Sequence, residues 1–416
     1  MSEAEPKPAR PEVPADLQRR FRTPGDPLPG VIRQQREDFE VEELPLYEPS
    51  GQGEHVYARV EKCGLPTPEL VRRLARLLKI PQRSIGYAGL KDARAVTRQT
   101  VSLPGVDPEQ VAAIDEAQFR VLSVARHTNK LKLGHLRGNR FRLRVRGAGA
   151  HAAAARNVLE ALAAEGVPNY FGLQRFGRSR RTHLLGRALV HEDGQAAIAE
   201  LLAPPVAPHP READAREAAA AGDYAAAAER FPKSASAERA VCRALAEGRD
   251  AASAIRAIPI KLRRLYTAGF QSWLFNAYLS RRLERMHLLE QGEVAWLHRN
   301  GACFVVEDQA AEAPRAASQE ISPSGPLFGR RLLRPDPESS AWADEQEVLA
   351  ELAPGLPPEL SEALGAKPLG QRRALRFPLS DPQLEVEGDD LWLGFVLPRG
   401  CYATAVLEEI LKRPVD

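Results

Sequence analysis

Residues 140–146 read RFRLRVR, and in this stretch arginine alternates with Phe141, Leu143 and Val145. Successive side chains of a β-strand point to opposite faces of a sheet, so a period of two is typical of a strand with one buried face. The stretch therefore predicts a strand whose apolar face packs in a core and whose other face carries four arginines.

Strand-like patterns occur toward both ends of the chain, whereas the middle has a helical pattern. Residues 196–258 are rich in alanine and are expected to form several helices. Period-two alternation or short apolar runs predict further strands at residues 38–43, 55–60, 85–90, 97–103 and 393–398. Strands at both ends with helices between them predict an α+β fold, in which a helical domain is inserted into an α+β domain.

Three other segments have local patterns that predict their structure. The residues Thr67-Pro68-Glu69 predict the start of a helix, with the Thr67 hydroxyl as its N-cap. Residues 318–329 are rich in Ser, Pro and Gly, and we expect a loop there. Residues 1–30 contain seven prolines and few large apolar side chains, which is typical of a flexible tail.

The charges are sorted along the chain in a way that the total conceals. The 416 residues include 58 Lys and Arg against 55 Asp and Glu, a formal net charge of only +3. Three basic segments nevertheless contain no carboxylate, at residues 70–91, 117–159 and 166–190. Clustered cations favour binding to nucleic-acid phosphates, although a solvated basic face is the alternative for any one segment. Aromatic residues that could stack on unpaired bases lie among them and favour RNA: Phe141, Tyr170, Phe171 and Phe176.

Several classes of protein are disfavoured by what the sequence lacks. It has no GxGxxG, GxxxxGK[ST], HExxH or GxSxG motif, so the common nucleotide, zinc-protease and serine-hydrolase sites are not expected. The four cysteines and nine histidines show no metal-ligand spacing, and we expect no metal. The chain has no apolar leader and no apolar run of about 18 residues, so we expect neither export nor a membrane span, and a reducing cytoplasm fits the cysteines.

The strongest candidate for chemistry is a carboxylate in a basic, glycine-rich setting. Residues 86–99 read GYAGLKDARAVTRQ and contain Asp92 between Lys91 and Arg94. Neighbouring cations stabilise the ionised form of a carboxylate, which suits a nucleophile or a base. On the residues alone, Asp92 could equally be a structural group that pairs with Arg94 or caps a turn.

At this segment the sequence closely resembles the TruD family of tRNA pseudouridine synthases. Other segments agree with the family in order: EDFEVEE around Phe39, GNRF around Asn139 and Phe141, PNYFGLQRFG at 168–177, QSWLFN at 271–276 and LPRGCYAT at 397–404. The resemblance covers everything after the N-terminal tail. It implies a catalytic domain on a mixed, mainly antiparallel sheet, here residues 31–168 and 370–416. A second, helix-rich α/β domain, residues 169–369, would be inserted in it and form a basic cleft with it.

The resemblance also implies roles for particular residues. Asp92 corresponds to the catalytic carboxylate, and Phe39, Asn139 and Tyr402 correspond to residues that contact the target nucleotide. Phe141 and Arg33 also match active-site positions of the family. Many relatives have Lys in place of Arg33 and Phe in place of Tyr402, so charge and ring are retained at both positions.

The reaction that the resemblance implies is the isomerisation of a uridine to pseudouridine, at U13 in the D arm of tRNA. The bond between uracil N1 and ribose breaks, and the base rejoins the ribose through C5. The carboxylate of Asp92 would either add to ribose C1′ or remove the C2′ proton to give a glycal, and it must be ionised for both. Arg33 or Lys91 could keep it so. No cofactor is expected, tRNA is the expected partner, and no obligate protein partner is evident.

Two alternatives from other functional classes remain at this point. A non-catalytic RNA-binding or chaperone protein would explain the basic segments, with Asp92 structural. The alanine-rich residues 196–258 could alternatively form a module that binds another protein.

Overall fold

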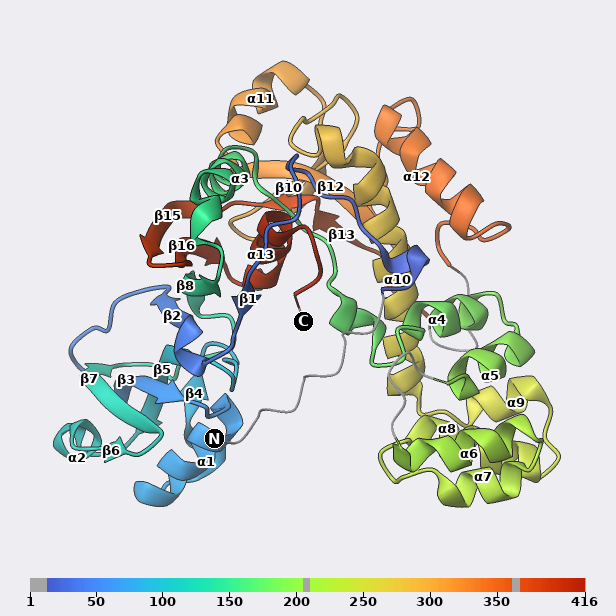
Figure 1. Cartoon of the computed structure of the whole chain (residues 1–416), viewed down its shortest axis with the longest axis horizontal. Helices are drawn as coiled ribbons and strands as arrows, with labels where there is room; N and C mark the ends of the chain where they lie inside the picture. Colours follow the sequence, from blue (N-terminus) through green and yellow to red (C-terminus); the bar gives the residue numbers. More distant parts are fainter. Residues whose placement is uncertain (1–12, 205–209, 361–366, 416) are drawn as a thin grey trace. The chain divides into compact units, whose positions relative to one another are not determined.

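The computed structural model describes residues 13–204, 210–360 and 367–415. Contacts divide the chain into two compact units, shown with all elements in Figure 1. The sheet unit comprises residues 23–167 and 377–415, and the helical unit comprises residues 168–376 together with the N-terminal residues up to 22. The chain passes between the units in two short strands, β9 (Val167–Pro168) and β14 (Arg376–Phe377).

The sheet unit is built on one large mixed sheet. The strand order is β15-β16-β8-β2-β5-β3-β7-β6, with β1 added beside β8 and β4 beside β5. Strands β2 and β5 run parallel, whereas β8 pairs antiparallel with both β2 and β16, and β3 pairs antiparallel with β5 and β7. The predicted α+β class with a mixed, mainly antiparallel sheet is confirmed. Its strands are β1 (Val31–Ile32), β2 (Phe39–Pro45), β3 (His55–Cys63), β4 (Gly86–Tyr87), β5 (Val96–Pro104), β6 (Asp115–Glu116), β7 (Phe119–His127), β8 (Leu136–Arg146), β15 (Ser380–Glu387) and β16 (Asp390–Pro398).

Strand β8 lies inside this sheet and has the two faces that its sequence predicts. Phe141, Leu143 and Val145 are buried in one hydrophobic cluster, whereas the arginines between them are at least partly exposed. Helices α3 (Ala152–Glu165) and α13 (Ala403–Leu411) contribute their apolar faces to the same cluster. Helix α1 (Thr67–Leu77) packs in a second cluster with β3 and β5, and the short helix α2 (Pro108–Ala112) adds Val111 to it.

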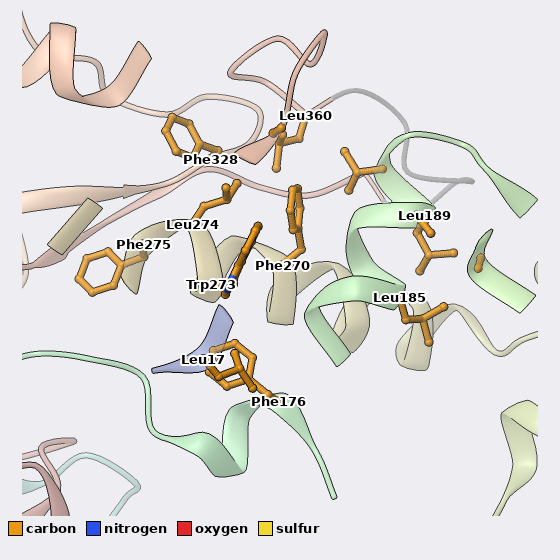
Figure 2. Packing of buried hydrophobic residues seen from close by; sticks show 14 of the residues in the cluster. Leu17, Phe176, Leu185, Leu189, Phe270, Trp273, Leu274, Phe275, Phe328 and Leu360 are labelled. Carbon is orange, nitrogen blue, oxygen red and sulfur yellow. The ribbon is translucent and has the colours of Figure 1, made fainter. Parts of the chain in front are cut away.

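The helical unit surrounds one long helix, α10 (Ile260–Arg282), with shorter helices and a four-stranded sheet of order β11-β10-β12-β13. The apolar positions of α10 form the centre of its core, where Phe270, Trp273 and Leu274 are buried (Figure 2). The other helices are α4 (Thr182–Val190), α5 (Gly194–Leu202), α6 (Pro210–Ala220), α7 (Tyr224–Arg230), α8 (Ser236–Ala246), α9 (Ala251–Arg256), α11 (Gln309–Ala317) and α12 (Ser340–Leu352). The strands are β10 (Val294–Leu297), β11 (Cys303–Val305), β12 (Ile321–Leu327) and β13 (Gln371–Ala374). Within the described residues, no helix is both long enough and apolar enough to cross a bilayer.

The prediction of a loop at residues 318–329 is wrong, because strand β12 occupies most of that range. This strand pairs on both sides, with β10 and with β13. Residues 321–326 are all buried, so no period-two alternation exists for the sequence to reveal. Gly325 is required there by packing, since a Cβ atom would lie within 3.0 Å of Tyr278, Leu375 and Phe275.

The N-terminal segment differs from the flexible tail that its composition predicts. Residues 1–12 lie outside the described residues, but Ala15–Leu17 form a short 3₁₀ helix and Leu17 is buried in the core of the helical unit. The indole Nε1 of Trp273 donates to the carbonyl of Asp16 at 2.7 Å. Figure 2 shows Leu17 and Phe176 beside Trp273. Leu28 is buried in the core of the sheet unit. Two apolar side chains and a few polar contacts therefore fix the described part of a segment whose average composition is typical of disorder.

Replacing Leu17 by Ala tests this anchoring. A buried leucine truncated to alanine loses its contacts and leaves a cavity, so we expect the free energy of unfolding to fall by about 2–3 kcal/mol in urea denaturation. Leu288→Ala, at a side chain that is 51% exposed in the same unit, should change it far less. Equal small effects of the two variants would mean that the segment is not anchored.

Candidate active site

The six residues singled out by the sequence all belong to the sheet unit, and four of them come from adjoining strands or strand ends. Arg33 follows β1, Phe39 begins β2, and Asn139 and Phe141 lie on β8. In the antiparallel pairing of β2 with β8, Glu43 is opposite Asn139 and Val41 is opposite Phe141. Directly paired residues share a face of a sheet, so Phe39, Glu43, Asn139 and Phe141 lie on the same face.

Asp92 lies in the loop that joins β4 to β5, with its side chain 42% exposed. Its Oδ1 accepts a hydrogen bond from the backbone N–H of Arg94 at 3.0 Å, which closes a turn. Its Oδ2 is 3.5 Å from Nη2 of Arg33. Asp92 therefore caps a turn, as its sequence setting allowed, and also pairs with a cation through the oxygen that the turn does not use. The paired guanidinium belongs to Arg33 rather than to Arg94.

Arg33 is held over an aromatic ring. Its guanidinium carbon is 4.0 Å from the ring centroid of Phe39, and the Phe39 ring meets the ring of Phe141 edge-on with centroids 6.3 Å apart. Burial lowers the pKa of Arg33, whereas the charge of Asp92 raises it. The backbone of Arg33 has a φ of +54°, a left-handed conformation that is uncommon outside glycine. Phe39 thus supports the cation that faces Asp92.

Lys91 does not contact the carboxylate of its neighbour Asp92, although its sequence position allowed this. Its Nζ is 2.7 Å from Oε2 of Glu43, and the two side chains are only 5% and 2% exposed. The backbone N–H of Lys91 donates to the Thr67 hydroxyl at 2.9 Å, and this hydroxyl donates to Oε1 of Gln99 at 2.9 Å. The Asp92 loop is therefore fastened both to β2 and to the start of α1.

The use of the Thr67 hydroxyl corrects one prediction about helix α1. The helix begins at Thr67 as expected, but its N-cap position is Pro66, and no side chain caps it. The hydroxyl is engaged by Lys91 and Gln99 instead, so it is not available for the first turn of the helix.

Lys62 is a residue near the site that sequence reasoning missed. It is buried at the end of β3, and its Nζ donates to the carbonyl of Leu65 at 2.6 Å and to the carbonyl of Asp92 at 3.3 Å. Burial and, to a smaller extent, the nearby charge of Lys91 lower the pKa of Lys62 to about 8, against the opposing effect of Asp92. A signal was present, because Lys62 continues the buried alternation of Val56, Ala58 and Val60.

Asn139 and Tyr402 each present a group that a ligand could contact, an unpaired oxygen and an exposed ring. The buried Oδ1 of Asn139 has no hydrogen-bond partner among the described residues. Tyr402 is the N-cap residue of α13, and its side chain is 58% exposed. An unpaired buried acceptor is costly, so the Asn139 carbonyl oxygen is suited to a donor that arrives with a ligand.

Comparison with known proteins shows the family to which the chain belongs. The family model for tRNA pseudouridine synthase D (TruD) matches residues 18–410. The chain belongs to the tRNA pseudouridine synthase D family. It is 47% identical to tRNA pseudouridine synthase D of Geobacter metallireducens over 401 residues, which cover 95% of this chain and 98% of that protein. It is 36% identical to tRNA pseudouridine synthase D of Thermus thermophilus over 392 residues, which cover 92% of this chain and 90% of that protein.

A solved structure of the family shares the fold. The crystal structure of a protein assigned as tRNA pseudouridine synthase D from Methanosarcina mazei matches with a TM-score of 0.84 at 28% identity, covering 95% of this chain and 96% of that one. The resemblance that the sequence motifs indicated is thereby confirmed.

In this TruD-family chain, the arginine face of β8 does not have the free positive charge that we inferred from the sequence. Each of its four arginines lies within 4 Å of a carboxylate, and the guanidinium of Arg142 also lies over the ring of Trp392 at 3.8 Å. The carboxylates come from the adjacent strands β2 and β16, from β15 beyond β16, and from Asp38, the residue before β2. The ion pairs are Arg140–Asp381, Arg142–Glu40, Arg144–Asp390 and Arg146–Asp38. Carboxylates from other parts of the chain therefore pair with the arginines of a segment that itself contains no carboxylate.

The described part of the chain contains no cluster of three or more His, Cys, Asp and Glu side chains placed to hold a metal. Within the described residues, no disulfide joins any of the cysteines Cys63, Cys242, Cys303 and Cys401.

The buried pair of Lys91 and Glu43 can be tested by removing one charge. Glu43→Gln leaves a buried ammonium group without its counter-ion, and we expect the free energy of unfolding to fall by about 3–5 kcal/mol in urea denaturation. The double variant Glu43→Met, Lys91→Met removes both charges and should recover most of this loss. A single variant as stable as the parent would show that the pair does not anchor the loop.

The depressed pKa of Lys62 predicts a pH dependence of stability. The folded-state pKa is about 8 against an ordinary value of 10.5. Between these two values the unfolded chain binds more protons than the folded chain, so the Lys62 contribution to the free energy of unfolding should rise with pH, by at most about 3 kcal/mol. Below pH 8 the penalty of burying the charge is fully present. Urea denaturation from pH 7 to 10.5 should show this rise in the parent but not in Lys62→Met. A constant difference between the two proteins would contradict it.

Proposed function

We propose that this protein converts a uridine of tRNA to pseudouridine, with the carboxylate of Asp92 as the catalytic group. The observation that carries the proposal is the pairing of Asp92 with Arg33 in a chain of the TruD family. We extend the proposal to U13 in the D arm as the target uridine and to the cytoplasm as the place of action.

The reaction exchanges one bond to ribose for another. The glycosidic bond from C1′ to uracil N1 breaks, the base turns, a bond from C1′ to C5 forms, and C5 loses a proton while N1 gains one. No group is transferred to water and no electrons leave the substrate. Asp92 would begin either by adding to C1′ or by removing the C2′ proton, and its Oδ2 is the oxygen that the turn leaves available in both routes.

Other residues of the site fit the needs of a uracil base. The uridine must leave its stack before the carboxylate can reach the ribose, which costs a few kcal/mol. The exposed ring of Tyr402 can compensate by stacking, at about 1–3 kcal/mol per base. The unpaired Oδ1 of Asn139 can accept the N3–H of uracil. Phe39 and Phe141 would act by holding Arg33 in place, since the face of the Phe39 ring carries the guanidinium.

Binding of the RNA backbone would fall to cations that have no carboxylate partner. Arg94, Lys132 and Arg137 are exposed, and none has an ion pair within the described residues, in contrast to the arginines of β8. Unpaired cations retain their attraction for phosphate, whereas a guanidinium already bound to carboxylates gains less. The basic cleft between the two domains, expected from the sequence, stays a prediction.

Asp92→Asn is the direct test. The amide keeps the shape of the side chain and can accept the Arg94 hydrogen bond, but it is neither a nucleophile nor a base of comparable strength. We expect pseudouridine formation in a tRNA transcript to fall at least about 1,000-fold, with tRNA affinity within about threefold of the parent.

The matched control is Asp381→Asn, which removes an exposed, ion-paired carboxylate from β15 and should retain activity. Substantial turnover by Asp92→Asn would overturn the catalytic assignment. A parent protein that binds tRNA but forms no pseudouridine would favour the non-catalytic RNA-binding alternative. A transcript with cytidine at position 13 should lose the modification, and unchanged modification would reject U13 as the target.

A further inference from the structure

The three most exposed large hydrophobic side chains among the described residues of the sheet unit lie in the Asp92 loop and in two segments that hydrogen bonds connect to it. Leu133 is 70% exposed, Leu90 is 66% exposed and Tyr402 is 58% exposed. Leu90 is two residues from Asp92 in the same loop. Single exposed leucines are common on protein surfaces, but the most exposed ones of a unit are not expected to gather in one place without a binding partner.

Hydrogen bonds join the three segments that carry these side chains. The backbone N–H of Gly134, next to Leu133, donates to the carbonyl of Ala88, two residues before Leu90, at 2.8 Å. The guanidinium of Arg399, three residues before Tyr402, donates to the carbonyl of Gly134 at 2.9 Å. The loop containing Leu133 therefore bridges the Asp92 loop and the segment that leads to Tyr402.

Leu90 and Leu133 are held outward by neighbours that point inward. Ala88 and Lys91, on either side of Leu90, are 2% and 9% exposed. Leu131 and Leu136, on either side of Leu133, are 4% and 6% exposed. Leu131 is also fixed through its backbone N–H, which donates to the Ser102 hydroxyl at 2.9 Å. Because the flanking residues are buried, the two leucines cannot turn into the core without loss of these contacts.

The charge around the two leucines identifies the kind of partner. Lys132 and Arg137 are on the loop and strand next to Leu133, Arg94 follows Asp92, and Arg399 bonds the Leu133 loop. All four are exposed, and none has a carboxylate partner within the described residues. Apolar side chains set among unpaired cations match a nucleic acid, which presents apolar base faces between phosphates.

We propose that Leu90 and Leu133 form an apolar wedge that contacts the bases next to the target uridine and keeps them apart while the uridine is out of its stack. This proposal rests on the proposed function, because it takes RNA as the substrate. Leucine is among the residues that nucleic-acid-binding proteins insert between bases to unstack them. The position beside Asp92 is where a stack opened by removal of one base would expose the faces of its neighbours.

The test compares alanine variants in activity and in tRNA binding. We expect the double variant Leu90→Ala, Leu133→Ala to lower kcat/KM for a tRNA transcript about 10- to 100-fold, with each single variant in between. Affinity for the transcript should fall while its dependence on salt concentration keeps the same slope, since no phosphate contact is removed. Leu122→Ala and Val386→Ala remove side chains that are 41% and 55% exposed on β7 and β15 and serve as matched controls.

The outcomes separate this proposal from the proposed function. A double variant whose kcat/KM and tRNA affinity both stay within twofold of the parent overturns the wedge, and a protein partner would then be the better occupant of the surface. A changed dependence of tRNA affinity on salt concentration also overturns it, because the substitutions would then have altered contacts between protein cations and phosphates. If the parent forms no pseudouridine, the proposed function fails on its own, and the affinity comparison still decides whether the leucines contact RNA.

Discussion

The buried ion pair between Lys91 and Glu43 is the contact on which the site depends. Both side chains are almost completely removed from water, so neither charge would be stable without the other. Glu43 belongs to β2 and lies opposite Asn139 of β8, while Lys91 precedes Asp92. The ion pair therefore fixes the position of the Asp92 loop relative to β2, which pairs with the strand that carries Asn139. Thr67 and Lys62 add hydrogen bonds to the same loop, at the backbone N–H of Lys91 and at the carbonyl of Asp92.

This arrangement separates the cation that holds the loop from the cation that faces the carboxylate of Asp92. Lys91 is occupied by Glu43, so the partner of Asp92 comes from Arg33, a residue distant in sequence and supported by the ring of Phe39. Since the Asp92–Arg33 pair is partly exposed, a substrate can displace or share the guanidinium without disturbing the buried pair. The buried pair thus holds the loop independently of the exposed pair at the Asp92 carboxylate.

The two faces of β8 show how far a pattern along the chain predicts the chemistry of a surface. The alternation in residues 140–146 correctly predicted a strand with one buried face. The inference of a free cationic face failed, because Glu40, Asp381 and Asp390 reach the arginines from outside the strand. Absence of carboxylates along the chain does not mean absence of carboxylates across a sheet. Similarly, the buried residues 321–326 of β12 show no alternation, and Leu17 anchors a segment whose composition is typical of a tail.

The sequence by itself determined the fold class and the family, and it predicted the residues of the candidate site, because period-two alternation and ordered motifs are properties of the chain. The tertiary structure decided which acidic side chain pairs with which basic side chain. Lys91 pairs with Glu43 instead of Asp92, and Arg33 pairs with Asp92. The Thr67 hydroxyl accepts a hydrogen bond from the loop that contains Asp92. Leu90 and Leu133 lie in segments that a backbone hydrogen bond joins. These outcomes depend on strand register and on burial, and both arise only when segments far apart in the sequence pack together.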